Sequence, residues 1–131
     1  MARNETTTII REGETVTGDG RTWYANGVDD LFHLRGDGAQ LVKADVVDET
    51  ESELAHVDTA QVIPEGLEPN AQYFGAVVSN LLVDTLTVRA NSKLQGITCF
   101  DGGIDGIEIY DCSIKTNSAH QIALFTAAQA A

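Results

Sequence analysis

Between residues 80 and 115, apolar side chains follow a short pattern that occurs twice. In each copy, two apolar residues separated by one position are followed by two variable residues and a second such pair. The segments Asn80–Arg89 (NLLVDTLTVR) and Gly106–Lys115 (GIEIYDCSIK) align position by position without a gap. Alternation with a period of two predicts short β-strands. The matching apolar positions are Leu81, Val83, Leu86 and Val88 with Ile107, Ile109, Cys112 and Ile114.

The extra residue between the two apolar pairs predicts a corner between two strands. A helix needs a period of 3.6 residues, and an ordinary hairpin needs a tight reversing turn that neither segment contains. A third strand follows each pair, because Gln95–Phe100 (QGITCF) aligns with His120–Phe125 (HQIALF) at almost the same spacing along the chain. Three strands in each coil predict that equivalent residues stack about 4.8 Å apart. The predicted fold class is therefore all-β, a short, right-handed, single-stranded parallel β-helix.

The same pattern divides the rest of the chain. A weaker copy, Gly38–Val47, and the preceding strand in DDLFHLRG make residues 31–47 the predicted first coil. Residues 73–125 form two regular coils, and residues 126–131 form a tail. The segment Asp48–Gln72 is acidic and contains both prolines, which predicts one projecting loop. An alternative for its start is a short acidic helix, because Leu54 and Val57 are three residues apart.

The two ends of the predicted β-helix differ. Residues 1–30 are expected to form an N-terminal arm and a strand and hairpin that cap the first coil, with turns at Gly13 and at Gly18–Gly20. The C-terminal end lacks an obvious cap, since TAAQAA after the last strand contains only small apolar and polar residues. We expect the last coil to be covered by this tail or by a neighbouring subunit.

Composition limits the classes of partner. The 131-residue chain has the size of one domain, and 20 acidic against 8 basic residues give a net charge of -12. Such a surface repels nucleic acid and anionic lipid. The sequence lacks a signal peptide and a transmembrane stretch, so we expect folding in the cytosol. Cys99 and Cys112 fall in apolar patterns, which favours buried reduced thiols over a disulfide.

Three segments carry a resemblance to a known superfamily. IREGETVTGDGRTWYANG, PNAQYFGAVVSNLLVDTLTV and LQGITCFDGGIDGIEIYDCSIKTNSAHQIAL are similar to the cap and coils of pectate-lyase-like β-helices, in particular those of bacteriophage virion proteins and tailspikes. The similarity covers about residues 9–125. It implies a right-handed β-helix that associates as a homotrimer about its long axis, whereas function must be argued separately.

Several side chains are candidates for catalysis or for ligand binding. A pectate-lyase-type site needs acidic calcium ligands beside Lys or Arg, and Arg89 and Lys115 are predicted to stack on one outer face, where they are expected to be solvated. Asp101 and Asp105 could serve as a glycosidase pair, but Asp-Gly turns are the favoured explanation of both residues.

The histidines His56, beside Asp58, and His120 could bind metal or shuttle protons, although structural or surface roles are favoured. An aromatic sugar platform is conceivable, but packing of the cap on the first coil is favoured for its residues Trp23, Tyr24, Tyr73 and Phe74. The remaining cations are Arg3, Arg11, Arg21, Arg35, Lys43 and Lys93.

These residues do not form a recognised catalytic motif, so we predict no catalytic, metal or cofactor site. The expected function is that of a non-enzymatic bacteriophage structural protein, a capsid decoration (cement) protein on the virion surface, assembled in the host cytoplasm. Its expected partners are further copies of itself and the major capsid protein or another virion protein, contacted through Met1–Arg11 and Asp48–Gln72. The alternatives are a tail or baseplate component and a carbohydrate-binding or depolymerase-type module acting on host polysaccharide.

Overall fold

The computed structural model describes residues 4–54, 57–68, 76–100 and 102–124, and within these ranges every regular element is a β-strand. The strands are short, as expected for a chain that turns after every few residues. They are β1 (Asn4–Glu5), β2 (Thr8–Ile10), β3 (Thr15–Thr17), β4 (Thr22–Ala25), β5 (Phe32–Leu34), β6 (Gln40–Val42), β7 (Asp45–Asp48), β8 (Asp58–Val62), β9 (Val77–Asp84), β10 (Thr87–Ala90), β11 (Gln95–Cys99), β12 (Gly103–Tyr110), β13 (Ser113–Lys115) and β14 (Ile122–Leu124).

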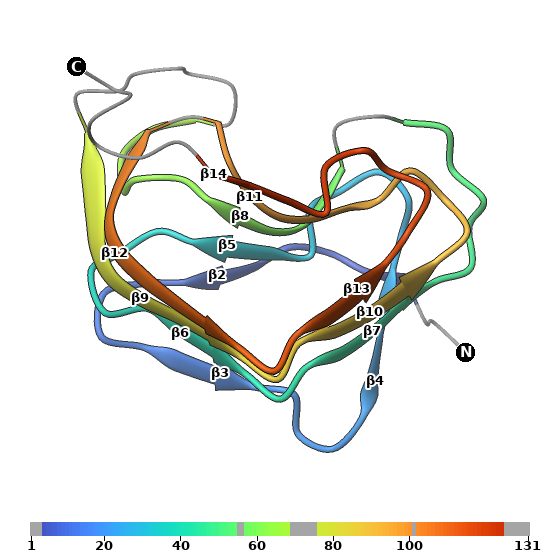
Figure 1. Cartoon of the computed structure of the whole chain (residues 1–131), viewed down its shortest axis with the longest axis horizontal. Coiled ribbons are helices and arrows are strands. Elements are labelled where there is room, and N and C mark those ends of the chain that lie inside the picture. The colour runs from blue at the N-terminus through green and yellow to red at the C-terminus, as the bar shows by residue number, and fades with distance from the viewer. Residues whose placement is uncertain (1–3, 55–56, 69–75, 101, 125–131) are drawn as a thin grey trace.

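The strands form three parallel sheets that enclose one interior (Figure 1). Sheet A has the order β1-β4-β7-β10-β13, sheet B the order β14-β11-β8-β5-β2, and sheet C the order β12-β9-β6-β3. Each coil therefore contributes one strand to each sheet: β2 to β4, β5 to β7, β8 to β10, and β11 to β13. The protein is a parallel β-solenoid of about four turns, which confirms the predicted all-β parallel β-helix.

The register of the sheets confirms the repeat found in the sequence. Leu81 and Val83 pair with Ile107 and Ile109, as the alignment of the two segments requires. The segment 32–34 supplies strand β5, which joins β2 to β8. Further pairs at predicted positions are Val88 with Ile114, Ile97 with Ile122, Cys99 with Leu124, Leu41 with Val83, and Val46 with Val88.

Corners of two residues join sheet C to sheet A in the second, third and fourth coils. The first corner residue has a left-handed backbone each time: φ is 57° at Lys43, 57° at Thr85 and 51° at Asp111. Such a residue turns the chain sharply. The second corner residue then points toward the interior, which produces the phase shift of one residue seen in the sequence.

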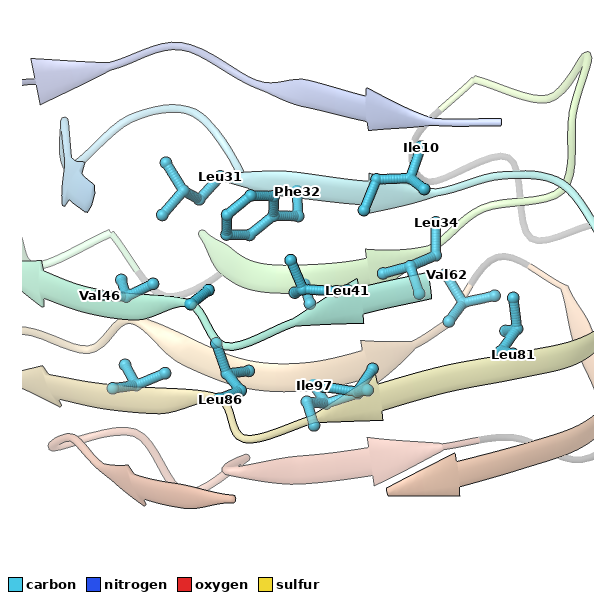
Figure 2. Close-up of a cluster of buried hydrophobic side chains, with 14 of the residues drawn as sticks. Ile10, Leu31, Phe32, Leu34, Leu41, Val46, Val62, Leu81, Leu86 and Ile97 are labelled. Carbon is cyan, nitrogen blue, oxygen red and sulfur yellow. The ribbon is translucent and has the colours of Figure 1, made fainter. Parts of the chain in front are cut away.

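The core is a stack of aliphatic side chains between the sheets (Figure 2). Alternate residues of a strand face opposite sides, so Leu41, Val46 and Ile97 point inward from sheets C, A and B. All three are fully buried, as is Phe32. Because each coil buries its apolar side chains against the coils above and below it, the stack holds the fold together.

The expected hairpin cap is wrong. Strands β3 and β4 do not pair with each other; they pair in parallel with β6 and β7 and so belong to a regular first coil. Gly18 allows this stacking, because a Cβ atom there would lie 1.9 Å from the carbonyl oxygen of Lys43. Residues 8–10 likewise pair with β5, so Met1–Arg11 is not a free arm over that part.

The prediction of one loop over residues 48–72 is also wrong, because residues 58–62 form strand β8 in the middle of sheet B. Its inward residues Ala60 and Val62 are fully buried, which explains why the chain returns to the coil here. Two excursions therefore flank β8: residues 49–57 join β7 of the second coil to β8, and residues 63–76 join β8 to β9 within the third coil. The described part of the first excursion contains no helix, and residues 55–56 and 69–75 lie outside the described ranges.

Candidate functional site

Four of the seven Arg and Lys residues that the structure describes bind acidic groups of the same chain. Arg89 and Lys115 occupy neighbouring positions on the outer face of sheet A, as predicted, and Arg89 pairs with Asp45 at 3.0 Å. The other ion pairs of Arg and Lys are Arg11 with Glu65 (2.6 Å), Arg21 with Glu5 (2.8 Å) and Lys93 with Glu53 (3.6 Å). Arg35 donates to the carbonyl oxygens of Pro64 and Leu67. These contacts stabilise coil stacking and leave little positive charge for an anionic sugar.

Of the candidate acids and histidines, the structure describes Asp58, Asp105 and His120, so only one member of each proposed pair is described. Asp105 is exposed on the outer face of β12, whereas Asp58 is buried at the start of β8. The side chain of His120 contacts Gln95, with 3.1 Å between Nδ1 and Nε2, and its ring lies 5.8 Å from that of Phe100. Asp101 and His56 lie outside the described residues. Within the part of the chain that the structure describes, no group of three or more His, Cys, Asp or Glu residues could hold a metal ion.

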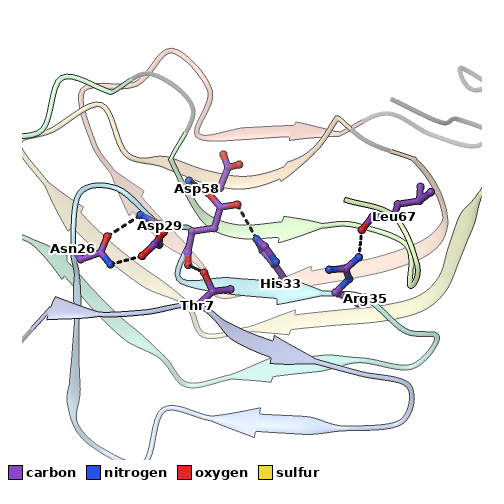
Figure 3. Close-up of polar contacts among 8 residues, drawn as sticks. Thr7, Asn26, Asp29, His33, Arg35, Asp58 and Leu67 are labelled. Atoms are coloured by element: carbon purple, nitrogen blue, oxygen red, sulfur yellow. Dashed lines mark hydrogen bonds and ion pairs between the residues drawn. The ribbon is translucent and has the colours of Figure 1, made fainter. Parts of the chain in front are cut away.

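Sequence reasoning missed a histidine–aspartate pair formed by His33 of β5 and Asp30 in the loop just before this strand (Figure 3). His33 Nε2 is 2.8 Å from the Asp30 carboxylate, and both side chains are largely buried. Asp30 also accepts a hydrogen bond from the backbone N–H of Asp58, at 2.8 Å, and its carbonyl oxygen accepts one from Thr7. These bonds connect three successive coils, so the pair has a structural use. The spacing of three residues is the only signal that the sequence offered.

A second buried polar cluster links the third and second coils. Asp48 accepts hydrogen bonds from the hydroxyl of Ser92, at 2.6 Å, and from the N–H and hydroxyl of Thr50. Asp48 and Ser92 are both buried. The carboxylate is therefore occupied by donors of its own chain and stabilises the stacked turns between sheets A and B.

For Trp23 the structure supports packing in the first coil, the interpretation favoured from the sequence, over an aromatic sugar platform. This side chain points into the core with only 6% of its surface exposed, contacts Phe32, and donates from Nε1 to the carbonyl oxygen of Gly18. Tyr24, its neighbour, faces outward and is half-buried. Tyr73 and Phe74 lie outside the described residues.

Both cysteines are free thiols, as predicted, but only Cys99 is fully buried. Cys112 occupies the inward corner position of the last coil and is half-buried. Burial raises the pKa of the Cys112 thiol, and the carboxylates of Asp84 and Asp111 raise it further. The Cys112 thiol is therefore a poor nucleophile at neutral pH.

The most distinctive surface is the C-terminal end of the solenoid. On the last strand of each sheet, β12, β13 and β14, most inward-facing apolar side chains remain partly exposed, and Ile122 is 51% exposed. Their partners on the neighbouring strands β9, β10 and β11, such as Leu81, Val83, Val88 and Ile97, are almost completely buried. We call this surface the open end; its six apolar residues are Ile107, Ile109, Cys112, Ile114, Ile122 and Leu124.

The opposite end of the core is better covered on the sides of sheets A and B. In the first coil Ile10 is fully buried and Trp23 nearly so, whereas Val16 on β3 is only partly buried. The guanidinium group of Arg21 lies over the Trp23 ring at 3.7 Å, and Glu5 of β1 binds Arg21. The two ends of the solenoid therefore differ in how far their apolar core side chains are exposed.

The open end has an acidic border on the side of sheet C. Strands β9 and β12 contain neither Lys nor Arg, and Asp84, Asp105, Glu108 and Asp111 lie on or beside them. The hydrogen bond that Tyr110 donates to Glu108 raises the pKa of this tyrosine, and the charges of Glu108 and Asp84 add to the effect. This border therefore favours cationic partners.

No family model, curated protein or solved structure matches this chain. The described residues contain no helix that is long and apolar enough to span a membrane.

Proposed function

We propose that this chain is a structural subunit of a bacteriophage virion, a capsid decoration protein that binds the head surface as an oligomer. The observation that carries the proposal is the asymmetry between the better-covered first coil and the open last coil. An exposed apolar surface bordered by polar residues is typical of a protein-binding site. The resemblance of the coil segments to phage β-helices gives the class of assembly.

A side-by-side homotrimer would suit this role. If three solenoids pack about their long axes, their open ends point in the same direction and can bind one surface together. Three weak contacts then act in concert, because the second and third binding events become intramolecular. The net charge of -12 keeps separate oligomers apart in solution before they meet the partner.

The test begins with the mass of the purified protein by light scattering, followed by co-sedimentation with capsids that lack the protein. We expect a stable oligomer that binds capsids saturably. A monomer that stays in the supernatant would contradict the proposal. Retention on host surface polysaccharide without capsid binding would favour the carbohydrate-binding alternative instead.

Two matched variants connect this test with the open end. Ile122→Asp places a charge in the open end, and Val28→Asp places the same charge at an exposed apolar residue in the loop between β4 and β5. We expect Ile122→Asp to weaken capsid binding at least tenfold and Val28→Asp to leave it within twofold. Equal effects of the two variants would show that another surface binds the capsid.

A further inference from the structure

The open end combines apolar side chains with three free sheet edges. Strands β12, β13 and β14 are the last strands of sheets C, A and B, and no described strand pairs with their outer edges. A free edge presents backbone N–H and C=O groups that can pair with another chain. Strand β12 is the longest of the three.

The side chains of β12 specify what would pair with this edge. Ile107 and Ile109 face the interior and are half-buried, whereas Asp105 and Glu108 face outward and are exposed. A strand added to β12 would place its own inward residues over the two isoleucines. Its outward residues would lie beside the two acidic side chains, where opposite charge is favourable and like charge is not.

Charge also distinguishes between the molecules that could bind the edge of β12. A second copy docking through the same end would bring Asp105, Glu108 and Asp111 against their own counterparts, and β12 offers no cation to offset them. A strand with basic outward residues meets no such repulsion. Charge complementarity therefore favours a different, basic partner over self-association at this surface.

We infer that the edge of β12 binds an extended segment of a partner protein that repeats the pattern of β12, with apolar residues over Ile107 and Ile109 and with Lys or Arg beside Asp105 and Glu108. The pattern includes a slip of one residue, because Gly106 has a φ of 90° and the alternation of inward and outward residues starts again after Gly106. The segment adds a parallel strand to sheet C and covers the open end. This inference rests on the proposed function, in which the partner belongs to the virion, and it names the chemistry of the contact.

The first test uses a blocked, fluorescently labelled peptide as long as β12, with the sequence Gly-Val-Lys-Gly-Val-Lys-Val-Lys, which repeats the β12 pattern with Lys at the outward positions, and a second peptide with Glu in place of Lys. Binding to the full-length protein is measured by fluorescence anisotropy at low salt. We expect saturable binding of the Lys peptide and at least tenfold weaker binding of the Glu peptide. Equal binding of the two, or none of the Lys peptide, would overturn the inference.

Two charge-matched double variants localise the contact. Asp105→Lys with Glu108→Lys reverses the charge on β12, and Glu12→Lys with Glu49→Lys makes the same change at exposed residues away from the last coil. We expect the first pair to weaken binding of the Lys peptide about tenfold and the second less than twofold. Equal weakening would mean that only net charge matters and would overturn the inference. Thermal unfolding of each variant checks that the fold is retained.

Hydrogen exchange of the free protein gives an independent criterion. The amides along the outer edge of β12 should exchange fast in the free protein and become protected when the Lys peptide binds. Strong protection without peptide would show that the chain's own residues cover this edge, and would overturn the inference. If capsids bind while neither peptide nor β12 charge matters, the inference fails and the proposed function stands; peptide binding without capsid binding gives the reverse result.

Discussion

The guanidinium group of Arg21 lies 3.7 Å from the centre of the Trp23 ring and covers part of the N-terminal end of the core. Glu5 of the edge strand β1 holds the guanidinium at 2.8 Å and also accepts the backbone N–H of Tyr24. A planar cation can stack on an aromatic ring while its edge stays hydrated. This contact shields Trp23 without the hairpin expected from the sequence, and it has no counterpart among the described residues of the last coil.

Arg21→Ala should therefore open the first coil. We expect the emission of Trp23, the only tryptophan, to shift to longer wavelength, and the free energy of unfolding to fall by about 1 kcal/mol. Arg89→Ala is the matched control, because Arg89 also pairs with an acid but lies on the outer face of sheet A. An unchanged emission spectrum for Arg21→Ala would contradict this shielding role.

Asp48→Ala should lower the free energy of unfolding strongly, although Asp48 lies at the end of strand β7. The substitution leaves the buried hydroxyl of Ser92 and the N–H of Thr50 without their acceptor, so we expect a loss of about 2–3 kcal/mol in urea unfolding. Asp45→Ala removes an exposed ion pair from the same strand and should cost less than about 1 kcal/mol. Similar losses for the two variants would mean that the buried cluster contributes nothing special.

Two threonines of the third coil should respond to glycine in opposite directions. Thr85 adopts a φ of 57° at the corner, which a β-branched residue tolerates poorly, so Thr85→Gly should raise the unfolding free energy by up to about 1 kcal/mol. Thr87 lies in strand β10, where Thr87→Gly should lower it by about 1 kcal/mol. Destabilisation by Thr85→Gly as large as that by Thr87→Gly would show that the corner is not strained.

The Cys112 thiol should titrate above its ordinary range. Burial raises its pKa, so the rate of alkylation by iodoacetamide should rise at higher pH in the folded protein than in denaturant. Because the folded state disfavours the thiolate, the contribution of Cys112 to stability is present below the unfolded pKa and declines as pH rises above it. Mass spectrometry of the alkylated peptides distinguishes Cys112 from the fully buried Cys99. Identical pH profiles in the two states would refute the prediction.

The sequence predicted the coils wherever apolar residues repeat at a constant spacing. The positions of Leu81 and Ile107 follow from alternation and from the alignment of their two segments alone. The first coil was missed because its inward set mixes Ile10, Val16 and Trp23, which do not resemble the later coils. Strand β8 was missed because Ala60 and Val62 are flanked by polar residues that sheet B nevertheless buries, including Thr59 and Gln61.

The polar contacts of the interior could not be predicted in the same way. The bond between Asp48 and Ser92 joins residues far apart in the sequence, which come together because the ends of β7 and β10 are paired in register. By contrast, the sequence already indicated that no obvious cap follows the last strand, although the tail expected to cover this end lies outside the described residues. The acidic border of the open end required the register, which places Asp84 beside Tyr110 on the next coil.

Hydrogen–deuterium exchange of the protein, free and bound to capsids, tests most directly whether the open end is the binding surface. The account predicts that capsid binding protects amides in residues 103–124 and leaves the first two coils unchanged. Protection confined to the loops at 26–31 and 49–54, with residues 103–124 exchanging as in the free protein, would contradict it.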